Sequence, residues 1–243
     1  MPTMNAMLPR RFPLLWMATA AALLLAACAT TPTTTPTPTP TPATSPTASP
    51  TPLPPDTMTV TALADGVGTF DLAAFPVANL KNNATYHGAA MVVAHFVTHK
   101  SGKTLGSLES VPVNLGPGET LAVSADCTDA CDGATSVTVT VSVGSWPTDV
   151  GAVFPTAAAA FSCSPCRAGH GFGDVKGTLK PSASLASGSP VVAFAVCHNA
   201  AGVILGGGTE EVIWPSAASF AVDVPVVINA APASCGLGAS TGW

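Results

Sequence analysis

The chain has 243 residues with only 8 basic and 13 acidic side chains, yet it carries 24 prolines and 22 glycines. No charged residue occurs between Arg11 and Asp56, which excludes a packed domain there and leaves the 187 residues from Thr57 for one medium or two small domains. Those residues are acidic overall and contain no cluster of Lys or Arg, so nucleic-acid binding is excluded as a function class.

The first 27 residues have the three parts of a secretory signal: a basic pair at Arg10-Arg11, an apolar stretch over 12–25, and small residues before a cleavage point. The run ends Leu25-Ala26-Ala27-Cys28, and this order of residue types resembles the lipobox of bacterial lipoprotein precursors. The resemblance implies a lipoprotein signal peptide over 1–27 and lipid attachment, palmitate included, at Cys28. The alternatives are a plain signal peptide or a transmembrane anchor, for which the apolar stretch is short.

Residues 28–56 follow as a tract made almost entirely of Thr, Pro, Ser and Ala. Proline fixes φ, removes hydrogen-bond donors and biases its neighbours towards extended conformations, so we expect a disordered, polyproline-like tether. At ~3.1 Å per residue, the 27 residues of 29–55 would reach about 80 Å when fully extended. That length suits a spacer between a membrane and a folded domain.

Alternation with a period of two residues dominates after Met58 and predicts antiparallel β-strands. The clearest case is 136–143, where four valines alternate with Ser and Thr hydroxyls. Similar patterns occur at 58–62, 111–115 and 220–226, and turn residues such as Pro117-Gly118 and Gly202 separate the runs. Long helical patterns are absent from the sequence, so the predicted fold class is all-β.

The globular part contains a repeat at an offset near one hundred residues. Leu80-Lys81 is echoed by Leu179-Lys180, the segment 92–97 by 192–197, and the segment 102–106 by 202–206. We therefore predict two tandem copies of one small β-domain, over 57–147 and 148–243.

The first copy resembles the FxLYD-like and related immunoglobulin-like domains of bacterial lipoproteins. The likeness covers about 45 residues and lies in 77–83, 92–98, 102–106 and 115–120. His99 and Asn199 stand where that family has Asp. The resemblance implies two tandem immunoglobulin-like antiparallel β-sandwich domains, each with about seven strands and without catalytic residues.

The second copy runs short of residues if Cys131 and Cys235 are equivalent. Either its last strand is missing, which leaves an open edge, or another segment fills the place, and the Ala-rich stretch 150–161 is the candidate. An open edge is a potential strand-addition site for a partner.

Six cysteines follow Cys28, and an even count in an exported chain predicts three disulfides, although fifteen pairings are possible. The favoured pairs are Cys127 with Cys131, Cys163 with Cys166, and Cys197 with Cys235. Two of these pairs are close in sequence, and the third would staple the second copy. The spacing of Cys163 and Cys166 also fits a thiol-redox motif, but Pro165 and a Gly-rich segment favour a structural disulfide.

Two further groups of residues have spacings that suggest metal binding. His95 and His99 could share a metal on a helix, but on the predicted strand they lie ~13 Å apart along the axis. Asp126, Asp129 and Asp132 crowd one loop, yet their spacing does not fit an EF-hand. The sequence therefore predicts no metal and no cofactor.

These features predict a non-enzymatic lipoprotein on the extracytoplasmic face of the cell membrane. Its β-domains would bind an unknown envelope or extracellular protein or glycan. One alternative is an extracytoplasmic thiol-disulfide oxidoreductase that uses Cys163 and Cys166, and another is a purely structural stalk domain without a ligand.

Overall fold

The computed structural model describes residues 54–70, 73–128, 131–167, 170–215 and 217–241. Within these residues the regular secondary structure is β-strand and each strand pairing is antiparallel. This confirms the all-β fold class that the period-two alternation predicted. The predicted leader, the lipid site at Cys28 and most of the tether lie outside the described residues.

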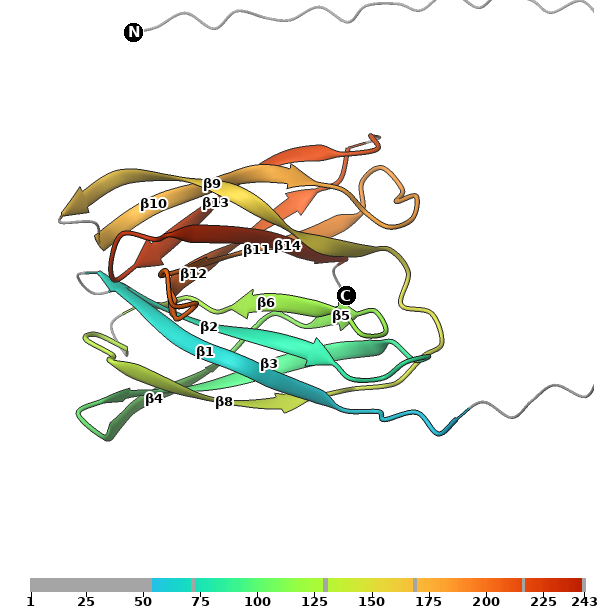
Figure 1. The fold of residues 1–243 in the computed structure, drawn as a ribbon, viewed down its shortest axis with the longest axis horizontal. Helices are drawn as coiled ribbons and strands as arrows, with labels where there is room; N and C mark the ends of the chain where they lie inside the picture. The colour runs from blue at the N-terminus through green and yellow to red at the C-terminus, as the bar shows by residue number, and fades with distance from the viewer. Residues whose placement is uncertain (1–53, 71–72, 129–130, 168–169, 216, 242–243) are drawn as a thin grey trace, which may run out of the picture. The chain divides into compact units, whose positions relative to one another are not determined.

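The first half of the globular part is a sandwich of two sheets (Figure 1). Its strands are β1 (Val60–Phe70), β2 (Ala73–Asn82), β3 (Ala89–Lys100), β4 (Lys103–Glu109), β5 (Val113–Leu115), β6 (Thr120–Ser124), β7 (Cys127–Thr128) and β8 (Ser136–Ser142). One sheet has the order β1-β2-β6 with β7 beside β2, and the other has the order β4-β3-β5 with β8 beside β3. Leu80, Phe96 and Leu121 meet in the core between the sheets.

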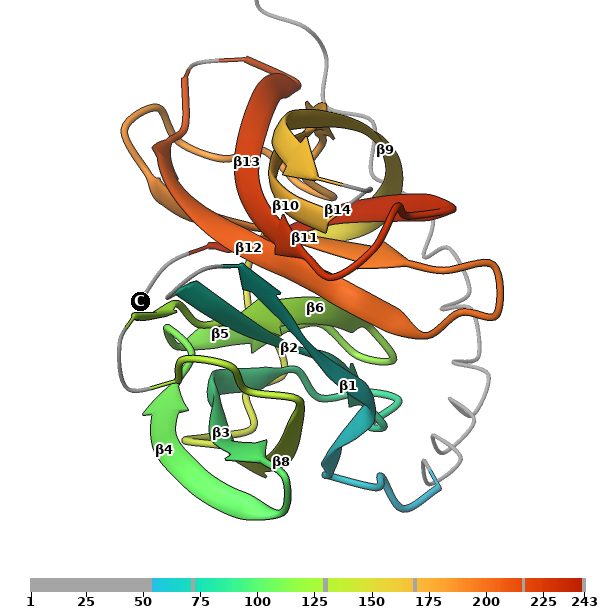
Figure 2. The ribbon, with the colours of Figure 1, turned by 90° about the vertical axis from the view of Figure 1, so that its left-hand side faces the viewer.

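The second half is a closed barrel in which the strands follow the order β10-β13-β12-β11-β14-β9 (Figure 2). Its strands are β9 (Val153–Arg167), β10 (His170–Leu179), β11 (Pro190–His198), β12 (Ile204–Ile213), β13 (Phe220–Ile228) and β14 (Ser234–Thr241). Phe154, Trp214 and Leu237 are among the large side chains of its core. Closure removes the open edge that was one of the sequence-based alternatives.

The repeat found in the sequence reappears in the strand pairing. Strands β1, β2 and β6 pair as β9, β10 and β13 do, and β4, β3 and β8 pair as β12, β11 and β14 do. Leu80 pairs with Leu121 in the first half, and Leu179 pairs with Phe220 in the second. Strand β14 therefore holds the place of β8, and the Ala-rich stretch forms much of β9, the counterpart of β1.

The halves differ in how these strands close. In the second half β9 pairs with β14, and β12 pairs with β13 at Gly206 and Gly207. In the described part of the first half, β1 and β8 lie near each other without a ladder between them. The same pairing scheme thus gives a sandwich in one half and a barrel in the other.

The outer face of the β1-β2-β6 sheet packs against the barrel. Val77 and Ala122 form a buried cluster with Val196 of β11 and Ile204 of β12. Strand β11 is buried on both faces, since Ala193 lies in the barrel core while residues 192 and 194 join the core of the sandwich. The described residues from Pro54 onward therefore belong to one compact unit.

Strand β1 contacts the barrel where its Gly68 lies against Gly206 of β12. A Cβ atom on either Gly68 or Gly206 would overlap the carbonyl oxygen of Val227, so the backbones approach too closely for any other residue. The side-chain oxygen of Asn229 then accepts a hydrogen bond of 2.7 Å from the backbone N–H of Thr69. Close packing and this hydrogen bond fix the end of β1 on the barrel.

Candidate functional site

Two of the three predicted disulfides are present among the described side chains. Cys197 and Cys235 occupy directly paired positions of β11 and β14, with their Cα atoms 4.1 Å apart. Cys127 and Cys131 form the second bridge, with a Cα separation of 5.8 Å. Cys163 is also disulfide-bonded, whereas the side chain of its predicted partner Cys166 lies outside the described residues.

Cys163 is exposed on the long strand β9. Thiol-redox motifs commonly place the reactive cysteine at a helix N-terminus, where the helix dipole lowers the thiol pKa. A strand has no such dipole. This way of activating a thiol is therefore not available to Cys163 on β9.

The two histidines with metal-like spacing lie on β3 and have separate partners. His95 Nδ1 is 2.9 Å from Glu109 Oε1, and its Nε2 is 2.8 Å from Ser142 Oγ. His99 Nε2 is instead 3.1 Å from Thr138 Oγ1. In the part of the chain that the structure describes, no three His, Cys, Asp or Glu side chains gather into a metal site. Of the three acidic loop residues, Asp129 lies outside that part.

The root of the tether is held by Asp56, whose side chain is only 7% exposed. Its carboxylate accepts hydrogen bonds from the backbone N–H groups of Thr85, Tyr86 and His87, and from His87 Nδ1 at 2.8 Å. Burial acts to raise the pKa of Asp56, but these hydrogen bonds prevail and lower it to about 2. The start of the globular part is therefore clamped before β1 begins.

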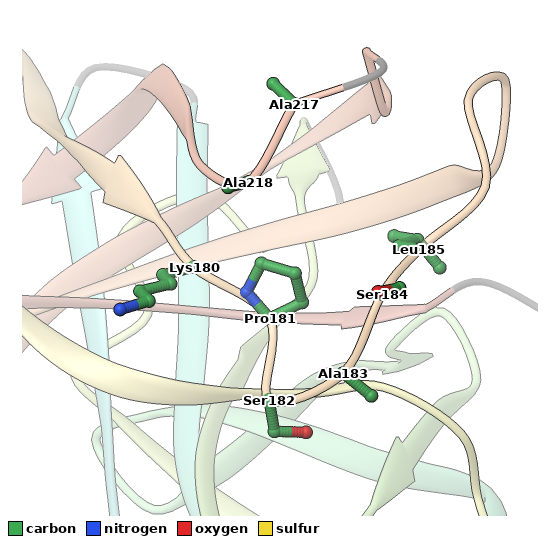
Figure 3. Close-up of a pocket in the computed structure, with 8 residues that line it drawn as sticks. All are labelled: Lys180, Pro181, Ser182, Ala183, Ser184, Leu185, Ala217 and Ala218. Atoms are coloured by element: carbon green, nitrogen blue, oxygen red, sulfur yellow. The ribbon is translucent and has the colours of Figure 1, made fainter.

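One pocket, of about 570 Å³, lies beside the loops that follow β10 and β12 (Figure 3). Its lining residues are Lys180, Pro181, Ser182, Ala183, Ser184, Leu185, Ala217 and Ala218. Ser182 Oγ accepts a hydrogen bond from the backbone N–H of Val153, and in Figure 3 the Lys180 ammonium group points away from Leu185. The polar side chains in its lining are Lys180, Ser182 and Ser184.

A second hollow, the interhalf groove, lies between the β2 and β6 strands of the sandwich and the β9 and β14 strands of the barrel. It encloses about 400 Å³ and is lined by Asn79, Thr120, Ala122, Thr156, Ala157, Ala158, Val196, His198, Ser234, Cys235 and Gly236. A smaller hollow of about 230 Å³ shares Ser234 and Cys235 with it and adds Phe161 and Pro232. Clefts between packed units are common positions for binding sites.

Four side chains in the interhalf groove carry polar groups without a hydrogen-bond partner among the described residues: Asn79, Thr120, His198 and Ser234. Burial lowers the pKa of His198, which favours the neutral imidazole. The groove thus combines uncharged polar groups with a floor of small apolar residues. The sequence analysis did not predict this site. The sequence feature that marks the groove is the run of alanines over 157–160.

The comparisons with known proteins add no relative. The chain matches no protein-family model, no curated protein and no solved structure. Among the described residues, the search for a helix long and apolar enough to cross a membrane found none.

Proposed function

We propose that this protein is a lipid-anchored bacterial lipoprotein that displays a non-catalytic binding module on the extracytoplasmic face of the membrane. The observation that carries the proposal is the order of its first segments: a signal-like leader, the sequence Leu25-Ala26-Ala27-Cys28, and an uncharged Thr/Pro tract. Lipid on Cys28 would anchor the chain, and the tract would act as a spacer.

A stabilised framework supports a binding role. The imidazole of His87 contacts Asp56, and that of His95 contacts Glu109. The disulfides join strands or close a loop, which suits stabilisation of a domain in an oxidising compartment. The interhalf groove supplies a concave surface for binding, and the disulfide-bonded Cys235 is among the residues that line it.

Metabolic labelling with palmitate tests the anchor. The wild-type chain is expected to incorporate label and to remain with the membrane fraction, because the diacylated cysteine inserts into the bilayer. The Cys28→Ala variant should lose the label and be released, while Cys127→Ala serves as a control for loss of a cysteine elsewhere. Label that persists in Cys28→Ala would refute the anchoring proposal.

The exposed, disulfide-bonded Cys163 favours a second candidate function, a thiol-disulfide oxidoreductase that uses Cys163 and Cys166. Such an enzyme would reduce insulin, and Cys163→Ser would abolish the activity. Insulin reduction at the level of a no-protein control, together with cysteines that stay oxidised, would eliminate this candidate.

A further inference from the structure

We propose that the interhalf groove binds an uncharged glycan. This inference rests on the proposed binding function and names the ligand class of that module. The glycan would lie in the interhalf groove, between Asn79 and Thr120 of the sandwich and Ala158 and Ser234 of the barrel.

The polar groups of the groove match hydroxyl chemistry. The amide of Asn79, the imidazole of His198 and the hydroxyl of Ser234 can each donate and accept hydrogen bonds. Sugar hydroxyls have the same dual capacity, so each group can pair with a ligand hydroxyl whichever way the proton points. No Lys, Arg, Asp or Glu is among the residues that line either hollow, so a charged ligand would find no counter-ion there.

The floor of the groove has room for flat rings. Ala157, Ala158 and Gly236 project little side-chain volume, and the first two are exposed. Phe161, which lines the smaller hollow, packs against the barrel core instead and lies outside the groove. Strand β9 lines the groove from Thr156 to Ala158, ~7 Å at ~3.3 Å per residue, which is about the length of one sugar ring.

The backbone around the groove is poorly suited to an extended peptide, the main competing ligand. Peptides that bind along strands need a free edge with unpaired N–H and C=O groups. Residues 157–159 of β9 already pair with β14, and Ala122 of the edge strand β6 is only 5% exposed. The carbonyl oxygen of Thr120 accepts the hydroxyl of Thr156 at 3.3 Å. Side chains therefore offer the available hydrogen-bonding groups, which favours a glycan.

Calorimetric titration of the full mature chain in detergent with chitotetraose, cellotetraose and maltotetraose tests the proposal. We expect saturable binding of at least one of these neutral probes. The Ala158→Gln variant, which fills the groove from an exposed strand position, should weaken that binding at least tenfold. The matched Ala221→Gln variant is also at an exposed strand position, on β13, but lines neither hollow, and it should bind as the wild type does.

The proposal is overturned if none of the three probes binds, if Ala158→Gln and Ala221→Gln bind equally, or if a neutral Ala/Thr tetrapeptide displaces the bound probe. Replacement of His198 by Ala gives a second variant, and weaker binding by it at unchanged thermal stability supports the site. The mass of the recovered probe separates this inference from the proposed function. An intact probe supports a binding module, whereas a shortened probe would overturn the non-catalytic function and leave the site in place.

Discussion

The sandwich and the barrel have the same strand pairing scheme but place the first strand of that scheme differently. In the sandwich, β1 pairs with β2 as far as Phe70 and, within that ladder, packs on the barrel at Gly68. Its counterpart β9 instead pairs with both β10 and β14 and completes the barrel. A repeated sequence thus specifies which strands pair within each copy, while the path of the first strand decides how the copy closes.

The two halves also depend on each other unequally. The barrel supplies residues 192 and 194 to the core of the sandwich, whereas its own core cluster is formed by residues of the second half. We infer that the barrel has the more self-contained core. The following predictions use this contrast, from the largest expected effect to the smallest.

Trp214→Ala should give the largest loss of stability. Trp214 is fully buried and packs edge-on against Phe154 and Phe220, with ring centroids 5.6 and 6.0 Å away. Removal of such a side chain costs ~3–5 kcal/mol of unfolding free energy, measurable by urea denaturation. Trp146 is only partly buried beside the sandwich core, so its replacement by Ala should lower the free energy of unfolding by clearly less. Equal losses for the two variants would contradict the contrast between the cores.

The disulfides should differ in the same direction. The loop-entropy model gives ~4 kcal/mol for the bridge between Cys197 and Cys235, separated by 38 residues, and ~2 kcal/mol for Cys127 and Cys131, separated by 4. We expect the double Ala variant of the first pair to unfold at lower denaturant than that of the second. The reverse order would show that strain or unfolded-state structure dominates loop entropy.

Gly206→Ala should break the junction between the halves. At a φ of 143°, the new Cβ would overlap the Val227 carbonyl within the barrel and, across the junction, would lie 2.8 Å from the Cα of Gly68 on β1. We therefore expect a loss of ~3 kcal/mol in the free energy of unfolding. Gly202→Ala is the control, because Gly202 also has a positive φ, of 79°, but no atom lies within 4 Å of its Cβ position. A similar cost for both variants would attribute the effect to backbone conformation alone.

Glu119, in the turn between β5 and β6, should make stability depend on pH. Its Oε1 atom is buried without a hydrogen-bond partner among the described residues, and burial raises the pKa of Glu119 from 4.5 to about 7. Because the folded state holds the proton more tightly than the unfolded state, unfolding free energy should fall by ~2 kcal/mol as pH rises from 4.5 to 7. Glu119→Gln should flatten that slope in urea titrations, and an unchanged slope would contradict the assignment.

Asp56→Ala should have the smallest and most local effect. The carboxylate of Asp56 clamps the start of the sandwich, whereas the start of the barrel at Val153 is held by the neutral side chain of Ser182. We expect faster hydrogen exchange at Thr85, Tyr86 and His87, with unchanged exchange in β8. In the wild type the clamp should weaken as pH falls from about 4 through 2. The pKa of Asp56 is lowered to about 2, and protonation of its carboxylate over this range removes the charge that accepts the hydrogen bonds. Protection that survives in Asp56→Ala would contradict the clamp.

Much of the local structure follows from the sequence pattern. The alternating valines over 136–142 form β8, and the repeated motifs mark β3 with β4 and β11 with β12. Cysteine spacing predicted the bridges at 127–131 and 197–235. The interhalf groove escaped prediction because Asn79, Thr156 and His198 come from three distant strands and form no motif in the sequence.

The sequence by itself predicted β-strands, a repeat and two of the disulfide bridges, because side-chain alternation, repeated motifs and cysteine spacing can be read directly along the chain. Only the tertiary structure decided that one copy is a sandwich and the other a barrel, and that β11 is buried on both faces. Those outcomes depend on the close approach of Gly68 and Gly206, which are 138 positions apart. Such a contact is set by backbone geometry across the whole unit, and no local pattern encodes it.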